Sequence, residues 1–219
     1  MPSERYTSAH TEELITDPAE RAIREAENGL HQAAFALEAI KNFVKEPERP
    51  FHLRQSLLIQ LHQKALAGIH PFAGTFRNGP VTIHGGRHQP PDAHLVAEEV
   101  AHMCDYVNEN WKRSAVFLSS FVLWKLNWIH PFPDGNGRTA RALSYVVLNV
   151  KTDSLLPGTT TIPDFISADK GPYYAALEAA DVAWKDTGDV NVSEVENLME
   201  AMLAKQLLQA ADEAVKGGT

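Results

Sequence analysis

A short polar stretch in the middle of the 219-residue chain holds the residue types of a phosphate-transfer site. Residues 130–141 read His-Pro-Phe-Pro-Asp-Gly-Asn-Gly-Arg-Thr-Ala-Arg. His130 has an ordinary pKa of about 6.5, so at neutral pH it can take a proton from an attacking hydroxyl. Asp134 is a hard oxygen ligand of the kind that binds Mg²⁺ together with substrate phosphates. The stretch therefore combines a candidate base with a candidate metal ligand.

The glycines and arginines of the same stretch indicate an anion site. Gly135, Asn136 and Gly137 allow positive φ angles and a close approach of the backbone to a ligand. A helix is expected to start near Arg138, with its free N–H groups and positive dipole end directed into the turn. Arg138 and Arg141 are three residues apart, so they share a helix face and can contact more than one phosphate group. For each residue alone a structural role is the better explanation, but together they predict nucleotide-phosphate transfer.

Two apolar helical segments, residues 114–129 and 138–150, must position this turn. Both are apolar enough to be buried, and chemistry is usually found in turns held by such a rigid scaffold. Gly and Pro place loops at 152–161 and a break at 164–171. The sequence predicts an all-α, mainly helical fold with one short β-hairpin. The other expected helices cover residues 17–44, 51–68, 91–111, 172–184 and 192–214.

The stretch 130–141 resembles the signature of the Fic family, His-x-Phe-x-(Asp/Glu)-Gly-Asn-Gly-Arg-x-x-Arg, at every specified position. The resemblance implies a mainly helical protein adenylyltransferase, which moves AMP from ATP to a Ser, Thr or Tyr hydroxyl of a target protein. On this resemblance His130 would be the general base, and Phe132 would anchor the loop in the core. Asp134 would hold Mg²⁺ between the α- and β-phosphates.

The same resemblance implies which residues contact ATP. The backbone of residues 135–137, with the Asn136 side chain, would cradle phosphate. Arg138 would contact the inner phosphates, and Arg141 would contact the γ-phosphate. A pair of aromatic residues lies where Fic proteins place groups near the adenine base, although packing in the core is an equal alternative for it. This pair is Tyr173 and Tyr174.

Residues 78–91 are the one convincing β segment, with a short strand at 81–83 and a tight turn at Gly85-Gly86. The segment resembles the Fic flap, a hairpin beside the active site. In the family, the exposed edge of this flap pairs with the backbone of the target and presents the acceptor hydroxyl. The alternative is an ordinary surface hairpin. The residues expected to dock the target are Val81, Thr82, Ile83 and His84.

A second, partial resemblance lies near the start of the chain. Many Fic proteins carry an inhibitory helix with the pattern (Ser/Thr)-x-x-x-Glu-(Gly/Asn), whose Glu pairs with the second arginine of the signature. Glu27 and Asn28 fill the last two positions, whereas Ile23 replaces the Ser or Thr. On this resemblance Glu27 would pair with Arg141 and occupy the γ-phosphate position. The alternative is that Glu27 is an ordinary solvated helix acid.

These features divide the chain into two expected parts. Residues 1–46 would be an N-terminal arm and candidate inhibitory helix packed on the core, and residues 47–219 would be the Fic catalytic core with its C-terminal helices. A weaker rival for the inhibitory pattern starts at Ser8 and places a glutamate at Glu12. This rival is followed by Glu13, where the pattern has Gly or Asn.

Composition limits the partners and the compartment. The formal net charge of −8 argues against nucleic acid as the main partner, because phosphate backbones need a basic surface. No apolar run is long enough for a membrane span, and residues 1–11 lack the apolar core of a signal peptide. The single cysteine, Cys104, fits a reducing, cytoplasmic setting. The expected partners are ATP and a protein substrate on the flap, with no nucleic acid or membrane, and a homodimer is left open.

Several other activities use the same loop. Some members of the Fic family transfer phosphate, another nucleotide or phosphocholine. The same pocket could also remove AMP from a protein, with Glu27 positioning a water. Asp134 and Arg141 favour AMP transfer over the phosphate transfer of Doc-like toxins, whose signature departs in its later part. A non-catalytic regulatory or antitoxin-like binding protein is the remaining class, and Mg²⁺-dependent ATP binding would distinguish the two classes.

Overall fold

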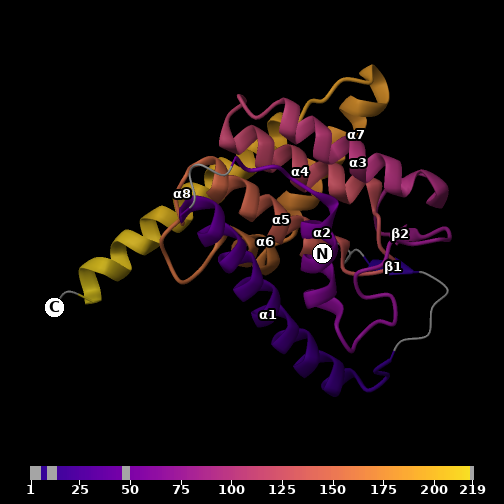
Figure 1. Ribbon diagram of the computed structural model, residues 1–219, viewed down its shortest axis with the longest axis horizontal. Coiled ribbons are helices and arrows are strands. Elements are labelled where there is room, and N and C mark those ends of the chain that lie inside the picture. Colours follow the sequence, from indigo (N-terminus) through magenta and orange to yellow (C-terminus); the bar gives the residue numbers. More distant parts are fainter. Residues whose placement is uncertain (1–5, 9–13, 46–49, 218–219) are drawn as a thin grey trace.

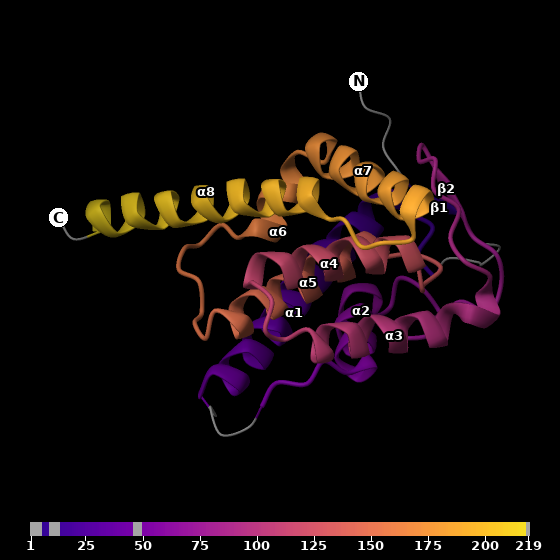
Figure 2. The ribbon, with the colours of Figure 1, turned by 90° about the horizontal axis from the view of Figure 1, so that it is seen from above.

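The computed structural model describes residues 6–8, 14–45 and 50–217. The expected mainly helical class is confirmed, with helices gathered around a central pair, α4 (Ala115–Ile129) and α5 (Asn136–Lys151) (Figure 1). Figure 2 shows α8 (Ser193–Gly217) lying beside α7 and extending beyond the other helices toward the C-terminus. The remaining helices are α1 (Pro18–Lys45), α2 (Gln55–Leu66), α3 (Val96–Glu109, preceded by the 3-10 helix η1, Ala93–Leu95), α6 (Ile162–Ala168) and α7 (Gly171–Thr187).

The central pair is buried on nearly all sides. Most of α4 and α5 is inaccessible to water, including the polar residues Ser119 and Ser144. Ser144 Oγ donates a hydrogen bond of 2.8 Å to the Ser119 carbonyl, which joins the two helices through groups that burial would otherwise leave unpaired. Since α4 ends and α5 begins within this core, the turn between them is held at both ends.

Helix α1 packs against α2 and α5 and begins where the sequence predicts. The backbone N–H of Glu20 donates to Asp17 Oδ1 at 2.8 Å, which is the expected N-cap. The helix continues unbroken through Gly29. Its buried face is partly polar, because the side-chain amide of Asn28 donates to the carbonyls of Ala65 and Ala67 on the α2 side at 3.3 and 2.8 Å.

A two-stranded antiparallel sheet joins β1 (Tyr6–Ser8) to β2 (Thr82–His84) (Figure 1). The prediction of a hairpin within residues 78–91 is wrong in one respect, because the partner of β2 is β1, near the N-terminus. The strand also starts at Thr82, one residue later than expected. The expected turn at Gly85 is present, with φ of 76°. Local sequence patterns predict a strand but carry no signal for a partner so distant in sequence.

The region 164–171, expected as a break, contains most of α6 and breaks only at residues 169–170, before α7. A reciprocal capping box forms here, in which Asp164 Oδ2 accepts the backbone N–H of Thr161 at 2.8 Å. This helix spans only Ile162–Ala168, so it is too short for a periodic apolar pattern to reveal it.

Two sequence expectations concern residues that the structure does not describe. The rival inhibitory acid Glu12 and the Glu13 that follows it lie outside the described residues, as does the junction at 46–49. Of the helices that are described, none combines the length and the apolar character that crossing a lipid bilayer demands.

Candidate active site

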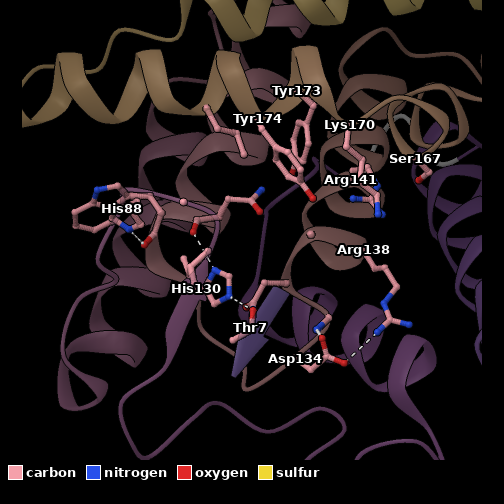
Figure 3. A pocket seen from close by; sticks show the side chains of 18 of the residues that line it. Thr7, His88, His130, Asp134, Arg138, Arg141, Ser167, Lys170, Tyr173 and Tyr174 are labelled. Carbon is pink, nitrogen blue, oxygen red and sulfur yellow. Dashed lines mark hydrogen bonds and ion pairs between the residues drawn. The ribbon is translucent and has the colours of Figure 1, made fainter. Parts of the chain in front are cut away.

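A pocket of about 410 Å³ opens where the α4–α5 turn meets α1, α7 and the sheet (Figure 3). The candidate base, the candidate metal ligand and the expected phosphate contacts all line this pocket, so the structure brings together the residues that the sequence singled out. Ile83 of β2 lines it as well, whereas Val81, Thr82 and His84 do not. The lining residues of the turn are His130, Asp134, Gly135, Asn136, Gly137, Arg138 and Arg141.

His130 ends α4 in a left-handed backbone conformation, with φ of 52° and ψ of 57°. This conformation is uncommon for residues other than glycine and persists where the surroundings hold it. The buried guanidinium of Arg77 does so, because its Nε donates to the His130 carbonyl at 2.8 Å and its Nη2 to the Ile129 carbonyl at 3.3 Å. Sequence reasoning missed this clamp, because its acceptors are backbone carbonyls and leave no residue pattern.

The contacts of the His130 ring define its tautomer. Nδ1 lies 3.3 Å from the Asn127 carbonyl, which can only accept, so Nδ1 carries the proton. Nε2 is then an acceptor, and the Thr7 hydroxyl donates to it at 2.7 Å. Burial lowers the pKa of His130 to about 4, which keeps the ring neutral near pH 7. The candidate base is thus in the form that can accept a proton from a hydroxyl.

The glycine-rich loop is fixed by packing and by one side-chain amide. Phe132 is fully buried, as expected, and stacks on His62 with ring centroids 3.6 Å apart. Asn136 Oδ1 accepts the Phe132 N–H at 2.9 Å, and its Nδ2 donates to the Phe132 carbonyl at 2.8 Å. Both polar groups of Asn136 thus bind the loop backbone, and a contact of its side chain with phosphate stays a prediction. Gly135 has φ of 75°, and a Cβ there would collide with Leu66.

A second buried histidine supports the loop from below. His62 Nδ1 accepts the Gly74 N–H at 2.8 Å, so its Nε2 carries the proton and donates to the Asp134 carbonyl at 2.9 Å. Burial lowers the pKa of His62 to about 4, as it does for His130. Two neutral histidines therefore underlie the candidate site.

These two histidines predict how stability depends on pH. Their pKa values are about 4 in the folded protein and about 6.5 in the unfolded chain, so only the unfolded state binds these protons in between. The free energy of unfolding should fall as the pH is lowered from about 6.5 toward 4, by up to about 1.4 kcal/mol per pH unit for each histidine. Urea denaturation at a series of pH values measures this slope.

The variant His130→Asn is the control for that slope, because it removes one of the two groups and keeps a polar side chain. Between pH 6.5 and 4, the slope of its free energy of unfolding against pH should be smaller by the contribution of one histidine, up to about 1.4 kcal/mol per pH unit. A slope equal to that of the parent protein would contradict the buried, neutral state of His130.

Two charged side chains of helix α1 and two of residues 130–141 contact one another and form a charged ring at the glycine-rich loop. Arg21 contacts Asp134 Oδ2 at 3.4 Å and Glu25 Oε1 at 3.3 Å. Arg138 contacts the same two oxygens, Asp134 Oδ2 at 3.2 Å and Glu25 Oε1 at 3.3 Å (Figure 3 draws the Asp134 contact). The candidate metal ligand Asp134 and the candidate phosphate contact Arg138 are thus already paired with side chains of α1. The i,i+4 spacing of Arg21 and Glu25 is the one sequence signal for this contact.

Glu27, the expected inhibitory residue, does not line the pocket. Its carboxylate pairs with Arg24 at 3.2 Å, and its side chain is 55% exposed. Each helical residue advances about 100° around the axis, so a residue two positions after Glu25 points to nearly the opposite face. The expected contact of Glu27 with Arg141 is therefore corrected, because Glu25 is the carboxylate that enters. Arg141 has no ion-pair partner among the residues that the structure describes.

The far wall of the pocket belongs to α7 and the residue before it. Tyr173 is buried, Tyr174 is half-buried, and both line the pocket with ring centroids 5.4 Å apart. Burial raises the pKa of the Tyr173 hydroxyl. Lys170 also lines the pocket, near Arg141 (Figure 3), and sequence reasoning missed it. This wall adds positive charge and aromatic surface, and the adenine contact of the tyrosines stays a prediction.

Asp134 is the candidate metal ligand of the site. In the described part of the chain, no group of three or more His, Cys, Asp or Glu side chains could hold a metal by itself. Asp134 Oδ1 accepts the Gly135 N–H at 2.6 Å, and its Oδ2 faces the two arginines. A single carboxylate beside an anion site suits Mg²⁺, which takes its other ligands from phosphates and water.

Comparison with known proteins identifies the family of the central segment. The model of the Fic/DOC family matches residues 52–148. The chain is 28% identical over 130 residues to protein adenylyltransferase fic-1 of Caenorhabditis elegans, covering 57% of this chain and 23% of that protein. It is 34% identical over 94 residues to protein adenylyltransferase Fic of Drosophila willistoni, covering 42% of this chain and 18% of that protein. The chain thus spans about a fifth to a quarter of the length of these curated relatives.

Solved structures show the same fold. Fic-1 of C. elegans (residues 134–508 of that protein) aligns with a TM-score of 0.69 at 20% identity, covering 94% of this chain and 55% of that chain. A Fic-domain signalling protein from Bacteroides thetaiotaomicron aligns with a TM-score of 0.68 at 22% identity, covering 87% and 73%. BepC of Bartonella tribocorum, solved with bound AMPPNP, aligns with a TM-score of 0.55 at 18% identity, covering 86% and 88%.

Proposed function

Because residues 52–148 form a domain of the Fic/DOC family, we propose that the chain is a protein adenylyltransferase, which transfers AMP from Mg-ATP to a protein hydroxyl. The observation that carries this proposal is the neutral His130, whose Nε2 accepts a hydroxyl hydrogen bond at 2.7 Å inside the pocket that Arg138 and Arg141 line. The adenylyltransferase names of the relatives and the AMPPNP bound by BepC support it.

The phosphates of ATP would bind at the start of α5. The N-terminal N–H groups of α5 and the cations Arg138, Arg141 and Lys170 supply the positive charge for the triphosphate. Asp134 would hold Mg²⁺, which would offset the negative charge of the phosphates. Tyr173 and Tyr174 would lie against the adenine base.

His130 would then act as the base. The oxygen of the acceptor hydroxyl attacks the α-phosphorus, its proton passes to His130 Nε2, and pyrophosphate leaves. The imidazolium that forms is held by Nδ1–H donating to the Asn127 carbonyl, so the ring does not turn during the transfer. As in other phosphoryl transfers, catalysis consists mainly of positioning and charge stabilisation.

The protein substrate would dock on β2. Ile83 of this strand lines the pocket, so an extended peptide paired with β2 would place one of its side chains beside His130. Thr82 and His84 would contribute backbone pairing on either side of Ile83. Val81 precedes the strand and would contact the target from outside the ladder.

Helix α1 would hold the enzyme in an inhibited state, with Glu25 in the role that the sequence assigned to Glu27. The charged ring pairs both Asp134 and Arg138, so Mg-ATP must displace α1 contacts to bind. Residues 1–46 would thus form a regulatory part and residues 47–219 a catalytic part. A reducing, cytoplasmic setting is in keeping with the single cysteine, Cys104.

Labelled ATP tests the reaction. Incubation of the chain with Mg²⁺, a cell lysate and either α- or γ-labelled ATP should place the α-label, and not the γ-label, on protein. Omission of Mg²⁺ should abolish the labelling. The bands on a denaturing gel are compared with those from the lysate alone.

Each other outcome selects a different activity. Transfer of the γ-label would indicate phosphate transfer, and labelling only from another nucleotide would indicate a different nucleotidyltransferase. Mg²⁺-dependent ATP binding in calorimetry, without labelling from any donor even in the Glu25→Ala variant, would indicate a non-catalytic binding protein.

A further inference from the structure

Strand β1 occupies the position where a target peptide would dock. It pairs antiparallel with β2, with Thr7 opposite Ile83 and with one further residue pair on each side. We propose that Thr7 is an acceptor of AMP in the chain's own active site, so that the enzyme modifies itself on its N-terminal strand. This inference rests on the proposed adenylyltransferase function and names one of its substrates.

The first support is the contact between Thr7 and the base. Thr7 Oγ1 lies 2.7 Å from His130 Nε2, and the side chain is half-buried in the pocket (Figure 3). Since Nδ1 of His130 donates to the Asn127 carbonyl, the Thr7 hydroxyl is the donor. This is the direction that general-base catalysis requires. In the described part of the chain, Thr7 is the only residue whose hydroxyl contacts His130.

The second support is the way the strand presents that hydroxyl. A three-residue ladder fixes the backbone of β1 on β2, so Thr7 cannot slide along the flap without breaking the register. The same pocket wall contains Gly137, Arg138 and Arg141, the residues that would hold the phosphates of ATP. The acceptor, the base and the nucleotide site therefore converge within one chain. A covalently attached acceptor also has a much higher effective concentration than a free target.

The reaction balances without any further reactant. The Thr7 Oγ–P bond forms as the bond from the α-phosphorus to the bridging oxygen of the β-phosphate breaks. The hydroxyl proton moves to His130 Nε2, and pyrophosphate carries away the electron pair of the broken bond. The products are the chain with AMP on Thr7 and pyrophosphate. Because β1 and a protein target need the same edge of β2, the two acceptors should also compete.

Substitution of Thr7 tests the proposal in the full chain. The parent, Thr7→Ser and Thr7→Val are incubated with Mg²⁺ and α-labelled ATP, each also in the Glu25→Ala background. We expect self-labelling of the parent and of Thr7→Ser, and its loss in Thr7→Val. Digestion and mass spectrometry should place AMP on Thr7. The labelled fraction at a given time should not change when the protein is diluted, because the reaction is intramolecular.

The matched control is Thr187→Val, at the end of α7. Its hydroxyl donates to the Ala183 carbonyl and does not line the pocket, so self-labelling should be unchanged. A second readout needs no ATP: the nitrogen resonances of the His130 ring should shift in Thr7→Val and stay near their parental positions in Thr7→Ser. Absence of that shift would show that the hydrogen bond does not form in solution and would overturn the proposal.

The labelling outcomes separate this inference from the proposed function. Equal self-labelling of parent and Thr7→Val would overturn Thr7 as the acceptor and leave the adenylyltransferase activity standing. Label on lysate proteins without label on the chain would do the same. No label on any protein in the Glu25→Ala background would overturn both the proposed function and the inference.

Discussion

His130→Ala is expected to lower AMP transfer by about 10²–10⁴-fold, the range typical of a lost general base, and to leave ATP affinity nearly unchanged. The reason is that Nε2 faces the Thr7 hydroxyl, where an acceptor would bind, whereas the expected phosphate contacts lie on α5. The pKa of His130 is about 4, so the base is available at neutral pH without prior deprotonation. Initial rates of labelling from α-labelled ATP, together with calorimetric titration of Mg-ATP, measure the two quantities.

His130→Asn is the companion variant, because it keeps a polar group at the same position but cannot take the proton. It should be as inactive as His130→Ala. Both variants should show the circular dichroism of the parent, because the loop is held by Phe132, His62 and Asn136. Parental rates in either variant would exclude His130 as the base. Loss of ATP binding in both would instead place the ring in the nucleotide site.

The pH dependence of the rate gives the same assignment an independent check. A base of pKa about 4 stays neutral as the pH falls through 6.5, so His130 itself should not slow transfer until the pH approaches 4. An exposed histidine with the ordinary pKa would lose activity near 6.5. The burial of the ring therefore widens the pH range in which the base works.

The turn between α4 and α5 could be predicted because its chemistry is local. Residues 130–141 carry the base, the carboxylate, the glycines and the arginines in one run, and flanking helices show themselves by their apolar character. Its supports could not be predicted. Arg77 and Asn136 bind backbone groups, and such contacts leave no trace in the pattern of residue types.

Helix α1 shows that contacts between residues far apart in the sequence are also hard to predict. The start of α1 follows from the Asp17 cap, but which acid enters the pocket depends on the rotation of α1 about its axis. That rotation is set by Asn28 and Gln32, which donate to carbonyls of residues 61–67. Apolar spacing alone does not give this rotation, because Leu30 is 73% exposed whereas Asn28 and Gln32 are buried. The family pattern therefore selects Glu27, whereas the acid of α1 that lines the pocket is Glu25.

Glu25→Ala is expected to raise the affinity for Mg-ATP about tenfold, within the range typical of coupling between an inhibitory contact and a ligand. Removal of this carboxylate frees Arg138 for phosphate and takes away the contact between Arg21 and Glu25. Arg21 can then leave Asp134, which becomes available to Mg²⁺. AMP transfer below saturating ATP should rise by a similar factor.

Glu27→Ala is the matched control, because it removes the same charge from the same helix, two residues away. Its carboxylate pairs with Arg24 outside the pocket, so ATP affinity and transfer rate should stay at parental values. Calorimetry with Mg-ATP and labelling at low ATP compare the two variants directly. Activation by Glu27→Ala with no effect of Glu25→Ala would mean that α1 turns in solution to the orientation that the family pattern implies. The two substitutions remove the same charge from nearly opposite faces of α1. The comparison therefore tests whether the orientation of this helix about its axis determines the inhibition.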